Sequence, residues 1–495
     1  MSKYLLGYDV GSSSVKATIL HIETGIPEAS ATSPKVEMKI MSPLPGYAEQ
    51  RPELWWEHIV NATKDLKAIS RFSESDIAAI GISYQMHGLV LVDKNHKVLR
   101  PSIIWCDSRA VGLGEKAFNE IGRKKCLSHM LNSPGNFTAS KLKWVKDNEP
   151  DIYDRIYKFM LPGDYIAMKL TGEIQTTVSG LSEGILWDFK IESLSDIVMN
   201  SFGFDASMVP DVVPTFSNQG SLSSIAAKQL GLKEGIPISY RAGDQPNNAL
   251  SLNVLKKGEI AATAGTSGVI YGISDLAKYD LQSRVNTFVH VNHTAENPKY
   301  GVLLCVNGTG IQNSWLKHNV TDMDYQEMNN EAENVPIGSE GLLTFPFGNG
   351  AERILGNLEP GGSVMGLDFN RHSRSHLLRS AQEGIVFALK YGFEIMENMG
   401  MEIDVVRAGE ANMFLSPIFR EAFVNTNQVV LEICNTDGSQ GAARGAGIGG
   451  NIYSGFSEAF IGLKINKKYE PDQNPSKEYN EVYINWLNEL KKQIV

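Results

Sequence analysis

Two stretches far apart in the chain carry the same short pattern, and this repeat constrains the fold more than any other feature. The pattern Gly-[Ser/Thr]-Ser-x-Val occurs at residues 11–15 and again at residues 265–269. In each case an apolar run leads into the turn and an alternating apolar run leaves it, which is typical of a buried β-hairpin with a polar tip. Two such hairpins, each at the start of a long α/β segment, favour a duplicated domain over a chance likeness between two Gly/Ser turns.

The first hairpin, residues 4–20, is also compatible with phosphate binding. Its glycine lets a ligand approach the main chain, and three consecutive serines with their N–H groups can form an anion-binding nest. Lys16 adds a positive charge at phosphate distance, and Asp9 precedes the turn. A carboxylate in this place is expected where a divalent cation lies beside phosphates, although an ordinary Gly/Ser hairpin accounts for the pattern equally well.

The two copies differ at the position that could hold a metal. Asp9 precedes the first turn by two residues, whereas Thr263 occupies the equivalent position of the second. Mg²⁺ binds through one or two carboxylates together with phosphate oxygens and water, so only the first copy would supply a metal ligand.

Composition limits the class of partner. A chain of 495 residues with 42% hydrophobic residues is long enough for two domains with separate cores. A formal net charge of −10 argues against a large nucleic-acid interface and against adhesion to anionic membranes. We therefore expect small-molecule partners, with no nucleic acid and no membrane among them, and we leave a homodimer open.

Targeting signals and cysteine usage indicate a cytoplasmic protein. No run approaches the roughly 18 apolar residues that a membrane span needs. The N-terminus lacks the basic segment and apolar block of a signal peptide. The four cysteines are scattered, without the paired spacing of a metal or redox site. HExxH, zinc-type and P-loop signatures are absent, and no GxGxxG follows a predicted strand, which excludes several common enzyme classes.

Polar clusters follow several predicted strands. Residues 77–83 have the length and composition of a buried strand, and residues 85–88 (Gln-Met-His-Gly) follow them. A second apolar run, residues 236–240, precedes a cluster that contains Asp244. An Asp at a strand end is placed to act as a general base, which transfer of a phosphoryl group to a sugar hydroxyl requires. The structural alternative is an Asp that caps the following helix.

Other segments predict helices and close packing. A helix is expected from Pro52, with apolar residues as far as Ile69 at helical spacing on its buried face. A final amphipathic helix is expected over residues 478–491. The Gly/Ala-rich residues 438–450 are expected to pack a helix closely on a sheet, without a chemical role, and residues 179–189 have the character of strand and turn.

These motifs together resemble those of the FGGY family of carbohydrate kinases, from the first strand to about residue 450. Within the family, the chain is most similar to the members that phosphorylate D-xylulose. The motifs that carry the resemblance occur in the family's order: Asp9-Val-Gly11-Ser12-Ser13, Gln85-Met86-His87-Gly88, Trp105-Cys-Asp107-Ser-Arg109, Phe137-Thr138-Ala139-Ser-Lys141-Leu-Lys-Trp144, Leu161-Pro162-Gly-Asp164-Tyr165, Gly243-Asp244-Gln245 and Gly265-Thr266-Ser267-Gly268-Val269. The family's C-terminal signature is largely present in Gly362, Val364, Gly366, Leu367, His376, Leu377 and Glu383.

The resemblance implies an α/β fold of two ribonuclease-H-like (actin-like ATPase) domains that flank a catalytic cleft. Residues 1–251 would form an N-terminal, sugar-binding domain, and residues 252–495 a C-terminal, nucleotide-binding domain. Packing of the final helix back on the first domain is left open. The resemblance also implies ATP with Mg²⁺, a small sugar as substrate, and transfer of the γ-phosphate to O5 of D-xylulose.

The resemblance further implies roles for individual residues. Asp244 matches the catalytic base, and Met86 with His87 matches the sugar-binding pair. Asp9 matches the carboxylate that lies near the phosphates and the metal, which it would reach through water. Further substrate contacts are implied for Gln245, Asp107 and Arg109. Nucleotide contacts are implied for Gly11, Ser12, Ser13 and Lys16 at the terminal phosphates, for Gly265 and Thr266 at the other nucleotide phosphates, and for Gly409 and Asn412 at the adenosine end.

Two departures from the family's pattern keep alternatives open. Gln245 stands where many members that act on D-xylulose have Asn, and Glu410 stands where the family usually has a second glycine. The substrate could instead be another ketose or polyol, such as ribulose, fuculose or glycerol. A non-catalytic actin-like nucleotide-binding module is the other alternative, but it would not require a base, and both Asp9 and Asp244 are retained.

Overall fold

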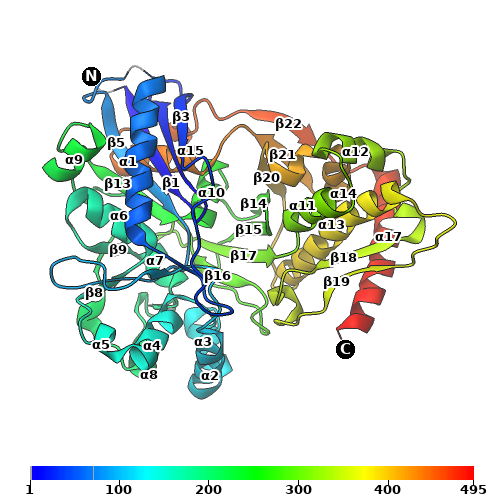
Figure 1. The fold of residues 1–495 in the computed structure, drawn as a ribbon, viewed down its shortest axis with the longest axis horizontal. Coiled ribbons are helices and arrows are strands. Elements are labelled where there is room, and N and C mark those ends of the chain that lie inside the picture. Colours follow the sequence, from blue (N-terminus) through cyan, green and yellow to red (C-terminus); the bar gives the residue numbers. More distant parts are fainter. Residues whose placement is uncertain (1–2, 71, 495) are drawn as a thin grey trace. The chain divides into compact units, whose positions relative to one another are not determined.

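The computed structural model describes residues 3–70 and 72–494, and internal contacts divide the chain into two units (Figure 1). The first unit comprises residues 1–253, 288–299 and 436–463, and the second comprises residues 254–287, 300–435 and 464–495. Each unit is therefore built from three separate segments, and the first unit takes sequence from both halves of the chain.

A sheet in the order β13-β5-β1-β2-β3 forms the centre of the first unit. Its strands are β1 (Tyr4–Val10), β2 (Val15–His21), β3 (Pro27–Ser33), β5 (Ile77–Tyr84) and β13 (Ile238–Gly243). β1 and β2 form the predicted hairpin, in which Asp9 pairs with Lys16. β5 lies parallel to β1, and β13 lies parallel to β5, so these three strands end at the same edge of the sheet.

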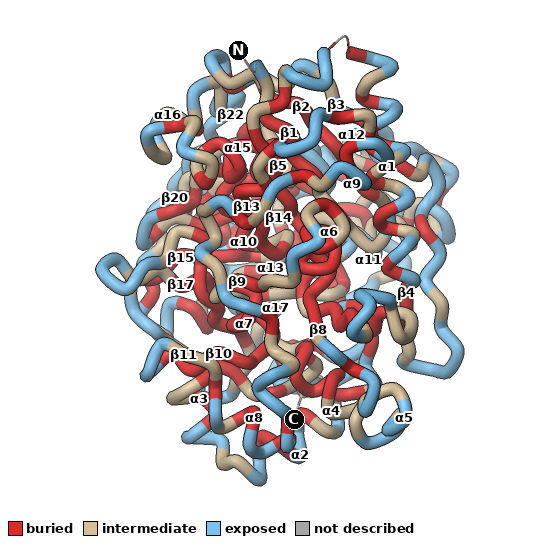
Figure 2. The backbone as a smooth tube through the Cα atoms, turned by 90° about the vertical axis from the view of Figure 1, so that its left-hand side faces the viewer, coloured by how far each residue is buried: buried red, intermediate tan, exposed pale blue. Residues whose placement is uncertain are grey.

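Helices cover both faces of this sheet, which explains the long apolar runs of its strands. α1 (Pro52–Ile69) and α6 (Pro162–Thr171) pack on one face, and α15 (Gly438–Gly449) packs on the other. Leu6 joins the core beneath α1, whereas its neighbour Leu5 joins the core beneath α15, as alternation along a strand requires. β13 is buried along its whole length (Figure 2).

α15 lies so close to the sheet that two strand positions exclude any side chain. A Cβ at Gly7 would lie 1.9 Å from the backbone oxygen of Ser439. A Cβ at Gly81 would lie 2.0 Å from the backbone oxygen of Ala442. The close packing predicted for residues 438–450 is therefore confirmed.

The remaining elements of the first unit surround this core. Its other helices are α2 (Val111–Ile121), α3 (Arg123–Met130), α4 (Thr138–Asn148), α5 (Pro150–Tyr153), α7 (Val178–Glu183), α8 (Asp196–Phe202), α9 (Ser224–Leu230), α10 (Asp244–Ser251) and α16 (Phe456–Ala459). Short strands pair as β4 (Glu49–Gln50) with β7 (Ser102–Ile103), β6 (Val90–Val92) with β8 (Lys158–Met160), β9 (Gln175–Thr177) with β12 (Asp211–Val213), and β10 (Trp187–Asp188) with β11 (Ser193–Leu194).

The second unit repeats the strand order of the first. Its sheet runs β16-β17-β15-β14-β20-β21-β22, with β14 (Glu259–Ala264), β15 (Gly268–Ser274), β16 (Asn286–Val289), β17 (Tyr300–Val306), β20 (Val405–Gly409), β21 (Val430–Cys434) and β22 (Ile465–Tyr469). β14 and β15 form the second predicted hairpin. β20 lies parallel to β14, and β21 lies parallel to β20. In the same way, β5 lies parallel to β1 and β13 lies parallel to β5. The duplicated domain predicted from the two hairpins is therefore confirmed.

The other described elements of the second unit are mostly helical. They include α11 (Gly310–Asn319), α12 (Tyr325–Glu333), α13 (Arg374–Asn398), α14 (Pro417–Asn427) and α17 (Gln473–Gln493), together with a hairpin of β18 (Leu343–Phe347) and β19 (Gly361–Met365). Across residues 3–70 and 72–494, no helix combines the length and the apolar character needed to cross a bilayer.

The last helix, α17, packs on α13 and α14 within the second unit. Its Trp486 is fully buried and stacks on Phe345, with ring centroids 5.1 Å apart. The indole Nε1 of Trp486 donates a hydrogen bond of 2.9 Å to the backbone oxygen of Thr344. α17 is therefore part of the core of the second unit.

Two local expectations are wrong. Residues 179–189 do not begin as strand and turn, because Thr177 Oγ1 accepts a hydrogen bond of 3.0 Å from Gly180 N and caps α7. Ile69 is 63% exposed rather than buried, since it is the last residue of α1 and follows the last buried position of that helix.

Candidate active site

The predicted site residues of the first unit gather at the carboxyl ends of three neighbouring parallel strands. Val10, Tyr84 and Gly243 end β1, β5 and β13 in register. Asp9 lies at the end of the first strand, and Asp244 directly follows the last. In open α/β sheets, ligands bind at this edge of the sheet.

Asp9 is the half-buried carboxylate of the hairpin. Its Oδ1 accepts a hydrogen bond of 2.8 Å from Ser83 Oγ on the adjacent strand. Burial raises the pKa of Asp9, and the nearby Asp437 raises it further, whereas Ser83 and Lys16 lower it. The ionised carboxylate would therefore be favoured by a cation bound beside it.

Asp244 is the first residue of α10 and is also half-buried. Its Oδ1 accepts from the backbone N of Gln245 at 3.0 Å, and its Oδ2 accepts from Gln245 Nε2 at 3.2 Å. Burial and the neighbouring carboxylate of Asp9 raise the pKa of Asp244 to about 7. A carboxylate with this pKa is suited to accept a proton near neutral pH.

Lys16 forms an ion pair that the sequence did not predict. Its Nζ lies 2.5 Å from Oδ2 of Asp437, the residue that caps α15. Asp437 Oδ1 also accepts from Ser439 Oγ at 2.7 Å and from Gln440 N at 3.0 Å. Burial raises the pKa of Asp437, but Lys16 outweighs it and holds the pKa below its usual value. The acidic residue just before the Gly/Ala-rich helix indicates a helix cap, but nothing in the sequence near it indicates the pairing with Lys16.

The tip of the first hairpin is held by side chains from other loops. Gly11 N donates to the backbone oxygen of Ser14 at 3.0 Å and closes the turn. Gln50 Nε2 donates to the backbone oxygen of Ser12 at 2.7 Å, and Trp105 Nε1 donates to Ser12 Oγ at 3.3 Å. The backbone oxygen of Ser13 accepts from Met38 N at 2.8 Å.

Met86 and His87 follow β5, next to the residue that precedes Asp244. Met86 is buried, and a Cβ at Gly243 would lie 2.5 Å from its Cγ. His87 has a φ of 61°, in the left-handed region that few non-glycine residues adopt. The strand ends therefore bring the predicted sugar-binding pair and the predicted base to one place.

The ring of His87 is oriented by its surroundings. Its Nδ1 lies 3.0 Å from the backbone oxygen of Glu183, and because a carbonyl only accepts, Nδ1 carries the proton. The ring packs edge-on against Phe137, with centroids 4.8 Å apart, and against Phe288 at 5.5 Å. A neutral ring in this tautomer has its acceptor lone pair on Nε2.

Two buried charged residues at this loop were missed by the sequence reasoning. Lys141 Nζ donates to the backbone oxygens of His87 at 2.8 Å and Ile104 at 3.0 Å. Burial lowers the pKa of Lys141 to about 7. Glu183 accepts a hydrogen bond of 3.3 Å from the backbone N of His87 through Oε1. Lys141 stands within a family motif, but Glu183 stood in a segment expected to be strand and turn.

Asp107 and Arg109 form a buried ion pair next to the loop. The Nη2 of Arg109 lies 2.7 Å from Asp107 Oδ2 and 2.7 Å from Glu49 Oε1, and its side chain is only 1% exposed. The guanidinium also lies over the ring of Tyr47 at 3.7 Å from the centroid. Through these contacts, Asp107 and Arg109 hold the loop that follows β7 in place.

In the second unit, the predicted nucleotide-binding residues also come together. A Cβ at Gly265 would lie 3.4 Å from Nδ2 of Asn412, which has a φ of 55°. The backbone oxygens of Gly265 and Thr266 accept from Gly310 N at 2.8 Å and from Ile311 N at 3.2 Å at the start of α11. Gly409 ends β20 and leads into the turn that carries Asn412.

Glu410, the residue that departs from the family pattern, has partners on β22. Its Oε2 accepts from Asn466 Nδ2 at 3.0 Å, and its Oε1 lies 3.3 Å from Lys467 Nζ. These hydrogen bonds and the charge of Lys467 hold the pKa of Glu410 below its usual value. The side chain is thus engaged by β22, and its backbone N donates to Cys434 O at 3.3 Å.

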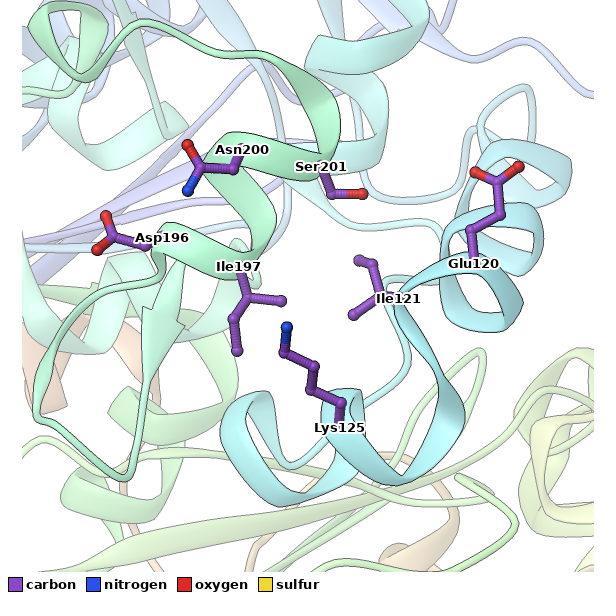
Figure 3. Close-up of a pocket in the computed structure, with 7 residues that line it drawn as sticks. All are labelled: Glu120, Ile121, Lys125, Asp196, Ile197, Asn200 and Ser201. Atoms are coloured by element: carbon purple, nitrogen blue, oxygen red, sulfur yellow. The ribbon is translucent and has the colours of Figure 1, made fainter.

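A pocket of about 500 Å³ lies elsewhere in the first unit, among α2, α3 and α8 (Figure 3). Lys125, Ile121 and Ile197 point into it, whereas Glu120 and Asp196 point away. None of the predicted site residues lines it. The predicted site residues of the first unit therefore lie at the strand ends and not in this pocket.

The donor set at the strand ends fits Mg²⁺. Within residues 3–70 and 72–494, no three or more His, Cys, Asp and Glu side chains form a cage for a metal. Asp9 and Asp244 are close enough for the charge of Asp9 to raise the pKa of Asp244. A hydrated cation that takes one or two carboxylates and completes its shell with water and phosphate suits such a set.

Comparison with known proteins identifies the fold and the chemistry. The model of the N-terminal domain of the FGGY family of carbohydrate kinases matches residues 4–251. A xylulose kinase of Bacillus subtilis is 31% identical over 470 residues, which cover 92% of this chain and 89% of that protein. The chain belongs to the FGGY family of carbohydrate kinases.

Solved structures agree with this assignment. A crystal structure of a "xyloylose kinase" from Brucella ovis has a TM-score of 0.88 and 25% identity, and 99% of each chain is covered. The fold is also that of a glycerol kinase from Plasmodium falciparum, with a TM-score of 0.88, 20% identity and coverage of 100% of this chain and 99% of that one. This FGGY-family member therefore has two domains of the actin-like ATPase fold and is an ATP-dependent carbohydrate kinase.

Proposed function

We propose that this kinase transfers the γ-phosphate of ATP to O5 of D-xylulose, with Asp244 as the general base. The observation that carries the proposal is the position of Asp244 at the end of β13, beside Asp9 and next to the loop of Met86 and His87. The D-xylulose assignment is supported by the Bacillus subtilis relative, whose name is xylulose kinase.

Asp244 would accept the proton of the attacking hydroxyl. Phosphoryl transfer needs little covalent help from the protein, so a positioned base and electrostatic stabilisation supply most of the catalysis. Gln245 holds both oxygens of Asp244 through its backbone N and its side chain, and this fixes the direction of the carboxylate lone pairs.

His87 and Met86 would bind the sugar. Because Nδ1 donates to the backbone oxygen of Glu183, Nε2 is the ring nitrogen of His87 that would accept a hydrogen bond from a sugar hydroxyl. Met86 supplies an apolar, polarizable surface for a C–H face of the sugar. Asp107 and Arg109 would contribute by fixing the neighbouring loop, since the guanidinium is enclosed by Asp107, Glu49 and Tyr47.

Asp9 would hold Mg²⁺ through water. When bound, the cation neutralises charge on the phosphate oxygens. Asp9 is kept in place by Ser83, and Lys16 is kept in place by Asp437, so a carboxylate and an ammonium group flank the phosphate-binding turn of Gly11, Ser12 and Ser13.

The second unit would hold the rest of the nucleotide. Gly265 and Thr266 present a turn whose backbone is fixed by the start of α11. Asn412 lies next to Gly265 and, with Gly409, forms the edge proposed for the adenosine. Because the side chain of Glu410 is engaged by Asn466 and Lys467, it does not need to enter that edge.

A coupled assay of ADP release over D-xylulose, ribulose, fuculose and glycerol tests the proposal. We expect the highest kcat/KM with D-xylulose. A different preferred sugar would contradict the substrate, and the absence of sugar-dependent ADP release from every member of the panel would contradict the base assignment as well.

A substitution tests the base separately. Asp244→Asn keeps the size of the side chain and removes its basicity, so we expect kcat to fall by about 10²–10⁴-fold. Binding of ATP, followed by calorimetry, should change little. If Asp244→Asn retained more than a tenth of the wild-type kcat, the base would be another group.

A further inference from the structure

Glu183 is a buried acidic residue that the proposed chemistry does not use. It ends α7 and is 1% exposed. Burying a carboxyl group costs free energy unless the group forms hydrogen bonds or is paired with a charge. Its contacts show what it does there.

Glu183 holds His87 at two points. Its Oε1 accepts from the backbone N of His87 at 3.3 Å, and its backbone oxygen accepts from Nδ1 of the same residue at 3.0 Å. One contact fixes the main chain of His87 in its left-handed conformation, and the other fixes the tautomer and the direction of the ring.

The second carboxyl oxygen of Glu183 lies against the strand end that carries the base. A Cβ at Gly243 would lie 2.5 Å from Glu183 Oε2 and 2.5 Å from Met86 Cγ. Glu183 therefore stands between the sugar-binding loop and the residue that precedes Asp244.

Burial disfavours the charged form of the Glu183 carboxyl group. Burial raises the pKa of Glu183 well above its usual value, and the carboxylates of Asp244 and Asp164 raise it further. The hydrogen bonds to His87 and the close approach to Gly243 are what give Glu183 its positioning role.

The helix that carries Glu183 is itself fixed. Ser179 Oγ donates to the backbone oxygen of Val289 at 3.1 Å, and Ser182 Oγ accepts from Val289 N at 3.0 Å. The preceding residue, Phe288, packs on the ring of His87. α7 thus offers a rigid support from which Glu183 can set the position of His87.

We propose that Glu183 is a positioning residue for sugar recognition, which sets the spacing between His87 and the Gly243-Asp244 backbone. The inference rests on the proposed function, because it takes His87 as the group that binds one hydroxyl and Asp244 as the base for another. A fixed spacing between these two groups selects sugars in which the two hydroxyls lie the matching distance apart.

A matched pair of variants tests this role. Glu183→Gln keeps an oxygen that can accept from His87 N, whereas Glu183→Met keeps a similar volume and removes the acceptor. We expect Glu183→Met to raise the sugar KM at least tenfold, and Glu183→Gln to raise it less than threefold. The KM for ATP should stay within twofold in both. The assay uses the sugar of the panel that the wild-type enzyme prefers.

Thr177→Val is the control for a purely structural effect. Thr177 caps α7 at its opposite end, so the substitution weakens the same helix without touching His87. We expect a lower thermal midpoint with an unchanged sugar KM. A rise in sugar KM in Thr177→Val as large as that in Glu183→Met would overturn the proposal, and so would equal sugar KM values for Glu183→Gln and Glu183→Met.

Hydrogen exchange of the His87 amide supplies a readout that does not depend on turnover. The amide should exchange at least tenfold faster in Glu183→Met than in the wild type, and at a rate near wild type in Glu183→Gln. If no sugar were phosphorylated, the proposed function would be wrong, but the exchange rate would still test the hydrogen bond between the His87 amide and Glu183. If exchange were unchanged in Glu183→Met, the contact itself would be disproved.

Discussion

At the scale of single residues, the half-buried carboxyl of Asp244 combines two properties. Both of its oxygens are held by Gln245, and Asp9 lies close enough to oppose its ionisation. The first property orients the group, and the second adds to the effect of burial, so that together they raise its pKa to about 7. Both properties should appear in measurements of activity and of stability.

The activity should depend on pH through Asp244. A general base works only when deprotonated, so kcat/KM should fall about tenfold per pH unit below an apparent pKa near 7 and level off above it. The measurement is a kcat/KM profile for the preferred sugar between pH 5 and pH 9, with saturating MgATP. A profile that stays flat down to pH 5 would contradict the assignment.

The stability should depend on pH in the opposite sense. The pKa of Asp244 is raised in the folded state, from 3.8 to about 7, so the folded protein binds more protons than the unfolded chain in this interval. Folding is therefore favoured at low pH, and this contribution is lost as the pH rises toward 7.

Asp244→Asn removes the titrating group, and with it the loss of folding stability at rising pH. Relative to the wild type, we expect the variant to show a higher thermal midpoint at pH 8 and a nearly equal one at pH 4.5, because the folded wild type carries a charge at this position only at the higher pH. The scans are made without nucleotide or sugar. An equal difference at both pH values would show that the buried charge of Asp244 does not matter to the fold.

At the scale of elements, local sequence patterns predict the strands and long helices, but they do not predict the residues that hold the site residues in place. The hairpins at residues 4–20 and 259–274 could be predicted because apolar runs flank a Gly-Ser turn, and this is a local signal. Asp9 and Asp244 could be predicted because polar residues at strand ends share an edge of a sheet.

Glu183 and Asp437 could not be found in this way. Glu183 is the last residue of a short helix whose capping residue, Thr177, lies in a run that alternates like a strand. Asp437 meets Lys16 across more than 400 residues of sequence, and nothing local to either residue marks the pair. Contacts of this kind depend on the packing of α7 and α15, which a sequence pattern does not specify.

The terminal helix α17 supplies a prediction about element stability. Trp486→Ala removes a stacked, fully buried indole and its hydrogen bond to Thr344, so we expect the free energy of unfolding to fall by about 3–5 kcal/mol. Lys491→Ala, at an exposed position of the same helix, should change it by less than about 0.5 kcal/mol. Denaturant titration of both variants makes the comparison, and equal values would place Trp486 outside the core.

At the scale of the whole molecule, each unit is built from separated stretches of chain. The first unit needs residues 436–463, because α15 covers one face of the β1, β5 and β13 sheet. Gly7 and Gly81 have no side chains of their own to cover that face. A first unit without α15 would therefore expose Leu5, Leu20 and Ala79.

A fragment experiment follows from this arrangement. Residues 1–253 alone should aggregate or lack cooperative thermal unfolding, whereas the same fragment joined by a flexible linker to residues 436–463 should unfold cooperatively at a higher temperature. Circular dichroism and sedimentation distinguish the two. Cooperative unfolding of the shorter fragment at the same temperature would show that α15 is dispensable.

The late position of α15 in the chain has a consequence for synthesis on the ribosome. The strand β13 is complete at Gly243, but α15 begins only at Gly438. At about 5–20 residues per second, roughly 10–40 s pass between these events. During that time the apolar face that α15 will cover has no native partner, so we expect the nascent chain to depend on chaperones far more than the finished enzyme does.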